Sequence, residues 1–285
     1  MHLVVVGAQK SGTTWLYSML RQHRQTGFSY LKEVHYFDRV HDRSTDSALR
    51  LSRLRRRLSN PGGLRERLSY PLRHLSADYR KYYDYVLNPE NAYTDEWYEA
   101  TFSKKPENIR KAKKVGNLVY CDLTPAYMAM PEQGYAHMAT LLPGLTPILI
   151  VRDPLRRAVS ALNMLHSRKL PSRKAGDSEI SPTLGERQIL RGDYGRSIPL
   201  LKKHFSRLKI IPFGRIQADP AGVLAEIEKI HGLDPMRYSG IGKKRNSRSG
   251  RFRLSEAALA EVNKVCAPQY EFLRQEFGSD FLKEI

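Results

Sequence analysis

This sequence has few cysteines, fewer acidic than basic side chains, and no long apolar run. Its 285 residues include only two cysteines, Cys121 and Cys266, which excludes a disulfide framework and allows one disulfide at most. No apolar run approaches the roughly 20 residues that a membrane-spanning helix needs. The early run Leu3–Val6 is too short for the apolar core of a signal peptide. We therefore expect a cytoplasmic protein with reduced thiols.

Acidic residues are also outnumbered, with 29 Asp+Glu against 48 Lys+Arg and a formal net charge of +19. A field of this sign attracts polyanions, which include nucleic acid, acidic polysaccharide and polyphosphorylated nucleotides. Hydrophobic residues make up 41% of the chain, which excludes global disorder. The length fits a single domain over residues 1–285, with a helical insertion at about residues 42–114.

Short β-branched and apolar runs predict the fold class. Leu3–Val6, Pro147–Val151 and Lys209–Phe213 each have the pattern of a buried parallel strand. A helical pattern begins at Trp15 and extends to about His23, and Ser255 is a suitable N-cap for a closing helix. Strands that alternate with helices indicate an α/β fold with a central parallel sheet.

The first strand leads into a glycine-bearing turn, Gly7-Ala8-Gln9-Lys10-Ser11-Gly12-Thr13-Thr14. Such a turn at a helix N-terminus presents backbone N–H groups and the positive end of the helix dipole to a phosphate. The turn fails the strict Walker A pattern because Thr13 occupies the lysine position and Lys10 comes earlier. This difference argues against an ordinary ATPase or kinase. A tight turn without a ligand is the simpler alternative.

Two further motifs carry charged groups of the kind that transfer reactions use. Lys32-Glu33-Val34-His35-Tyr36-Phe37 offers Glu33 or His35 as a general base; the plainer interpretation is a charged loop with a buried aromatic pair. Arg152-Asp153-Pro154 follows the second predicted strand, and Ser160 comes two helical turns later. An arginine fork suits a phosphate dianion, and Ser160 can donate one more hydrogen bond.

Together these motifs resemble those of the sulfotransferases that use 3′-phosphoadenosine 5′-phosphosulfate (PAPS). The opening turn is similar to the family's 5′-phosphosulfate loop. The resemblance therefore implies that the donor phosphosulfate is held by Lys10, Ser11, Gly12, Thr13 and Thr14. Lys10 would also have a catalytic role, because its charge would neutralise the bridging oxygen as the S–O bond breaks.

The segment Lys32–Phe37 resembles the one that supplies the catalytic carboxylate in the carbohydrate (heparan sulfate type) branch of that family. The resemblance implies that Glu33 takes the proton of the acceptor hydroxyl. His35 would support Glu33, or would itself be the base if the protein follows the small-molecule branch. Leu123 stands where many carbohydrate sulfotransferases have a lysine, which puts a second catalytic lysine in doubt.

Later segments complete the expected donor site. Arg152 and Ser160 resemble the family's 3′-phosphate site, Gly192-Asp193-Tyr194 resembles its G-x-Y segment, and residues 243–251 resemble its late basic loop. The full set of residues that the resemblance assigns to donor binding is Lys10, Ser11, Gly12, Thr13, Thr14, Arg152, Ser160, Tyr194, Lys243, Lys244, Arg245, Gly250 and Arg251.

The resemblance implies a P-loop-like three-layer sandwich with a central parallel sheet and a helical insertion on the acceptor side. The reaction would be in-line transfer from PAPS to a hydroxyl of a carbohydrate or glycolipid, anionic acceptors included. It would need no metal and would take place in a bacterial cytoplasm. A small-molecule kinase that uses ATP and Mg²⁺ is the first alternative. A basic nucleic-acid-binding protein is the second, although no recognisable nucleic-acid motif supports it.

Overall fold

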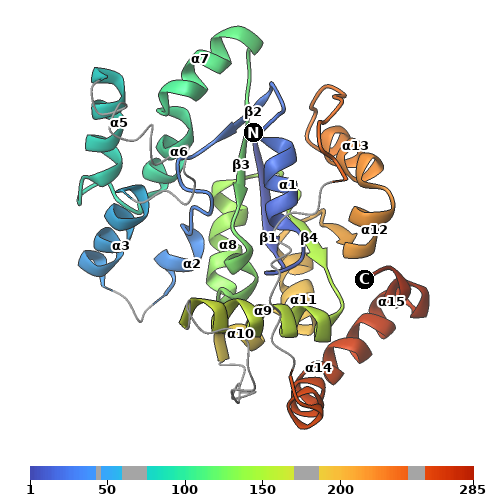
Figure 1. The fold of residues 1–285 in the computed structure, drawn as a ribbon. Helices are drawn as coiled ribbons and strands as arrows, with labels where there is room; N and C mark the ends of the chain where they lie inside the picture. Colours follow the sequence, from blue (N-terminus) through green and yellow to red (C-terminus); the bar gives the residue numbers. More distant parts are fainter. Residues whose placement is uncertain (43–45, 60–75, 170–185, 243–253) are drawn as a thin grey trace.

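The computed structural model describes residues 1–42, 46–59, 76–169, 186–242 and 254–285 (Figure 1). Its strands are β1 (His2–Gly7), β2 (Thr26–Phe28), β3 (Val119–Leu123), β4 (Ile148–Val151) and β5 (Lys209–Pro212). Its helices are α1 (Thr13–Leu20), α2 (Phe37–Val40), α3 (Ser47–Ser59), α5 (Ala77–Leu87), α6 (Asp95–Ser103), α7 (Pro106–Val115), η1 (Pro125–Ala129), α8 (Glu132–Leu141), α9 (Pro154–Lys169), α10 (Glu186–Leu190), α11 (Tyr194–His204), α12 (Phe213–Ala218), α13 (Pro220–Ile230), α14 (Glu256–Phe277) and α15 (Ser279–Glu284).

The five strands form one sheet in the order β2-β3-β1-β4-β5, and every neighbouring pair is parallel. β1 lies at the centre, where Val4 is opposite Asp122 of β3 and Val5 is opposite Ile148 of β4. Parallel strands need crossover connections, and α1, η1 with α8, and α9 to α11 lie in those connections. The carboxyl ends of β3, β1 and β4 therefore meet at one edge.

Alternate side chains of β1 enter two different cores, which makes the structure three layers thick. Leu3 and Val5 pack with α1, α12 and α13, whereas Val4 and Val6 pack with α6, α8, α11 and other helices on the opposite face. Both faces are covered, so the strands are apolar almost throughout. The helices α3, α5, α6 and α7 gather on the β2–β3 side of the sheet, and α12 and α13 lie on the other side (Figure 1).

The predicted fold class is confirmed, with some local differences. Ser255 caps α14 as expected, and its hydroxyl accepts a hydrogen bond from the Ala258 amide. The prediction missed β2 and β3, and the first helix ends at Leu20 rather than near His23. Phe213 begins α12 instead of ending β5. In residues 42–114, the described part is helical. Within the described ranges, no helix has the length and apolar character for crossing a membrane.

Cys121 and Cys266 are free, buried thiols. Burial raises the pKa of both, so the reactive thiolate is scarce in the folded protein. We expect neither thiol to react with a disulfide-exchange reagent until denaturant is added, after which both react. The measurement is the absorbance of released thiolate with and without denaturant. Full reaction of the native protein would contradict this placement.

Candidate functional site

The turn after β1 has the geometry of an anion-binding loop. Lys10 has φ of 73° and Gly12 has φ of 85°, and Gly12 is the N-cap of α1. A side chain at Gly12 would be strained by the backbone and would also come within 3.1 Å of the Phe213 ring. Residues 7–14 include no acidic side chain. The donor set is therefore backbone amides, hydroxyls and one ammonium group, which suits a phosphate or sulfate.

Arg152 meets this turn from the end of β4. Its Nη1 donates a hydrogen bond to the Lys10 carbonyl at 2.6 Å, across 142 residues of sequence. The guanidinium carbon also lies 4.8 Å from the centre of the Phe213 ring, a cation–π distance. The two predicted ends of the donor site are thus in direct contact.

Tyr194 fixes the backbone of Arg152 rather than pointing outward. Its side chain is fully buried, and its hydroxyl accepts from the Arg152 N–H at 3.1 Å and donates to the Arg152 carbonyl at 2.9 Å. Ser11, in the turn next to Lys10, is also fully buried. These contacts indicate that Tyr194 positions Arg152.

The remaining residues predicted to bind the donor are Ser160 and five residues of the late basic loop. Ser160 is partly exposed on α9, on the helix that starts after Arg152. Lys243, Lys244, Arg245, Gly250 and Arg251 lie outside the described residues. Among the described residues just before them, the Ile241 carbonyl accepts a hydrogen bond from the Trp15 indole of α1 at 2.9 Å.

The segment Lys32–Phe37, together with Asp38, forms a row of carboxylate, imidazole and carboxylate. His35 lies between Glu33, at 3.3 Å from Nε2, and Asp38 of α2, at 2.7 Å from Nδ1. Burial opposes ionisation of Glu33, but His35, Lys32 and Arg57 outweigh it and lower its pKa. Burial likewise opposes protonation of His35, yet the carboxylates of Asp38 and Glu33 raise its pKa. At neutral pH Glu33 is therefore ionised, and His35 holds its proton more tightly than a free imidazole does.

Two basic residues join this row to its surroundings. Lys32 Nζ donates to the Thr14 hydroxyl at 2.7 Å, which connects the second motif to the turn at the start of α1. Arg57 of α3 donates to the backbone carbonyls of Glu33 and Val34. The sequence singled out neither of these links, and it also missed Asp38, because each one depends on contacts formed only in the folded chain.

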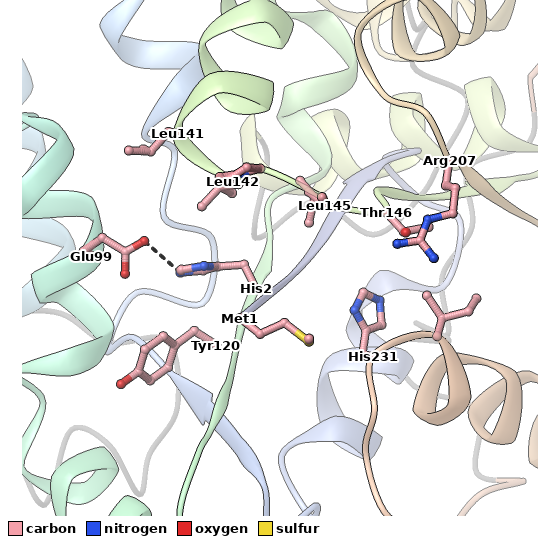
Figure 2. Close-up of a pocket in the computed structure, with 13 residues that line it drawn as sticks. Met1, His2, Glu99, Tyr120, Leu141, Leu142, Leu145, Thr146, Arg207 and His231 are labelled. Carbon is pink, nitrogen blue, oxygen red and sulfur yellow. Dashed lines mark ion pairs between the residues drawn. The ribbon is translucent and has the colours of Figure 1, made fainter.

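A cavity of about 360 Å³ lies elsewhere, at the opposite end of β1. Figure 2 shows His2, Glu99 and His231 on its wall. Burial lowers the pKa of His2 to about 4, so this imidazole is neutral at pH 7 and its 3.5 Å contact with Glu99 is not an ion pair there. The cavity contains none of the motif residues. Among the described residues, no cluster of three or more His, Cys, Asp or Glu could hold a metal ion.

Gly12 and Gly232 offer a matched test of the turn. Both have positive φ, but only Gly12 has neighbours within 4 Å of an added Cβ; Gly232 follows α13, where the Leu233 N–H bonds back to the Glu228 carbonyl. We expect Gly232→Ala to lower the free energy of unfolding by about 1–2 kcal/mol, the usual cost of a left-handed non-glycine residue. Gly12→Ala should lower it further because of the Phe213 ring. Denaturant unfolding measures both, and equal losses would contradict the crowding at Gly12.

Comparisons with known proteins agree with this geometry. The Sulfotransferase family model matches residues 3–237, whereas no curated protein gives a match. Among solved structures, a sulfotransferase from Alicyclobacillus acidocaldarius is 17% identical, with 96% of this chain and 94% of that chain covered and a TM-score of 0.61. Sulfotransferase STF9 from Mycobacterium avium is 14% identical, with coverages of 97% and 76% and a TM-score of 0.51. The shared fold and the family match over most of the chain show that this protein belongs to the sulfotransferase family.

Proposed function

We propose that this enzyme transfers a sulfuryl group from PAPS to a hydroxyl of a carbohydrate or glycolipid. The observation that carries the proposal is the contact between Arg152 and Lys10. It joins the turn suited to the phosphosulfate with the arginine suited to the 3′-phosphate, and a 3′-phosphate distinguishes PAPS from ATP. The turn amides, Lys10 and Arg152 fit such a ligand because they are all donors or cations.

Glu33 is the better candidate for the base. A general base must be unprotonated at the working pH, and the lowered pKa of Glu33 satisfies this at neutral pH. The raised pKa of His35 makes its imidazole harder to deprotonate, which favours Glu33 over His35 as the base. In the proposed step the acceptor oxygen bonds to sulfur, its proton goes to Glu33, and the bond from sulfur to the leaving phosphate oxygen breaks. Lys10 stabilises the charge on that leaving oxygen.

The proposal of a carbohydrate acceptor is supported by the segment Lys32–Phe37 and by the net charge of the chain. The segment Lys32–Phe37, which contains Glu33, resembles that of the carbohydrate branch, and a net charge of +19 favours anionic acceptors. α3 belongs to the region of residues 42–114, and its Arg57 contacts the backbone of Glu33. This contact favours an acceptor-side role for the region within a single 1–285 domain. The cytoplasmic, bacterial setting and the metal-independent reaction remain predictions.

The kinase alternative requires ATP with Mg²⁺, and Thr13 in place of the Walker lysine counts against it. The nucleic-acid alternative rests on net charge. It predicts binding that weakens steeply with salt and does not depend on Arg152. Titration with a nucleotide separates the three functions.

Arg152 should dominate the binding of adenosine 3′,5′-bisphosphate, the product of the proposed reaction. We expect Arg152→Ala to raise its dissociation constant about 10- to 100-fold, the equivalent of one or two charge-assisted hydrogen bonds. The exposed Arg156 on the next turn is the matched control, and Arg156→Ala should change the constant little. Calorimetric titration with and without Mg²⁺ measures this. Binding that needs Mg²⁺, or a dissociation constant that Arg152→Ala leaves unchanged, would overturn the donor assignment.

Glu33→Gln should lower kcat about 10²- to 10⁴-fold, the usual contribution of a general base. Affinity for adenosine 3′,5′-bisphosphate should be unchanged, because Glu33 acts on the acceptor. Glu96→Gln, an exposed change at the start of α6, is the control. Turnover is measured as transfer of labelled sulfuryl from PAPS to a panel of oligosaccharides, glycolipids, phenols and steroids.

Two results of that assay would count against the proposal. Transfer to phenols or steroids alone would exclude a carbohydrate acceptor. A larger loss in His35→Gln than in Glu33→Gln would assign the base to His35.

A further inference from the structure

Asp122 is a buried carboxylate whose hydrogen-bond network reaches the loop that carries the candidate base. It lies near the end of β3 with 0% exposure. Its Oδ1 accepts from the Thr124 hydroxyl at 2.5 Å, and its Oδ2 accepts from the hydroxyls of Tyr127 at 2.6 Å and Tyr98 at 3.3 Å. A buried carboxylate with this many donors forms the centre of a polar network.

The network extends to the backbone of the loop that carries Glu33 and His35. The Tyr36 N–H donates to the Tyr127 hydroxyl at 3.1 Å, and the His35 N–H donates to the Thr124 hydroxyl at 3.4 Å. The backbone of Val34 also acts on the Asp122 carboxylate and lowers its pKa. His35 and Tyr36 are thus each connected to this carboxylate through a single hydroxyl, and Val34 directly precedes them.

This loop needs such support because its backbone is not regular. Residues 31–36 form neither helix nor strand, and His35 has φ of 58°, a value that residues other than glycine rarely adopt. Residues held in sparsely populated conformations persist only where their surroundings fix them. A rotation of the His35 backbone would carry the imidazole away from Glu33, 3.3 Å from its Nε2.

We propose that Asp122 is a positioning residue for sulfuryl transfer. Its ionised carboxylate holds the backbone of Val34, His35 and Tyr36 so that Glu33 and His35 keep their mutual geometry. This inference rests on the proposed function, but it concerns a group that touches neither substrate.

The ionisation of Asp122 is separated in pH from that of its neighbours. Burial raises its pKa to about 6, even though Thr124 and Tyr127 act in the opposite direction. The groups that face it are Tyr98 from α6, Tyr127 from η1 and His35 from the loop, with Cys121 adjacent on β3. Burial raises the pKa of both tyrosines well above 10 and raises that of Cys121.

The pKa values of the two members of the candidate catalytic row shift in opposite directions. The pKa of Glu33 is below its usual 4.5 and the pKa of His35 is above its usual 6.5. A protonated Asp122 loses acceptor capacity for its hydroxyl partners. Turnover should therefore fall as the pH falls through about 6, before Glu33 is protonated.

The test compares Asp122→Asn with the exposed change Asp280→Asn. We expect kcat to fall about 10²-fold in Asp122→Asn, as for a small displacement of catalytic groups. Affinity for adenosine 3′,5′-bisphosphate should stay the same, and the decline near pH 6 should disappear. Tyr127→Phe removes the hydroxyl that links Asp122 to the Tyr36 N–H and should give a smaller loss of kcat. It also serves as the test variant if Asp122→Asn does not fold.

A second measurement is independent of turnover. Amide hydrogen exchange at Val34, His35 and Tyr36 should be about 10-fold faster or more in Asp122→Asn, because the opening of these amides costs less free energy. Unchanged exchange, or wild-type kcat with the same pH profile, would overturn the positioning role. If the wild-type enzyme binds no adenosine 3′,5′-bisphosphate, the donor proposal fails, whereas the exchange experiment still decides the role of Asp122.

Discussion

The parallel pairing of β1 with β3 on one side and β4 on the other is the constraint on which the site depends. It places the ends of three strands at one edge of the sheet, where ligands of α/β folds bind. The turn before α1, the Thr124–Tyr127 segment and Arg152 reach this edge from distant parts of the sequence. Because both faces of β1 are buried in separate cores, a shift of the strand would disrupt two layers at once. The geometry of the site is therefore fixed by the same packing that fixes the fold.

Two charged groups of residues meet at this edge. Lys10, Arg152 and the start of α1 form one group, and Glu33 and Asp38 around His35 form the other. The Lys32–Thr14 hydrogen bond connects the two groups. Under the proposed function, the first group would suit an anionic donor, and the carboxylates of the second would suit a hydroxyl that must lose a proton. Asp122 adds a buried negative charge at the centre of its hydrogen-bond network, although a neutral group would cost less free energy to bury there.

The sequence was sufficient to predict the sheet class, because that prediction rests on local patterns. The β-branched runs of β1 and β4 are continuous, whereas β2 has only three residues and β3 includes the polar Asp122; neither gives a clear strand pattern. Lys10 and Arg152 were singled out from their motifs, and the fold brings them into contact. The links of Asp38, Arg57 and Asp122 to the loop at Glu33 were not found, because each is a hydrogen bond or ion pair between segments that only the fold brings together. Tyr194 was identified, but its contact with the Arg152 backbone could not be inferred from sequence.

The Tyr194 hydroxyl has a consequence for how a ligand enters. By bonding to both the N–H and the carbonyl of Arg152, it immobilises the peptide groups on either side of that residue. The guanidinium can then leave the Lys10 carbonyl only through rotation about its own side-chain bonds. Side-chain rotations take place on the picosecond-to-nanosecond scale, far faster than loop rearrangements. Exchange of the carbonyl partner for the oxygens of an entering anion would thus be a rapid, local rearrangement of the Arg152 side chain.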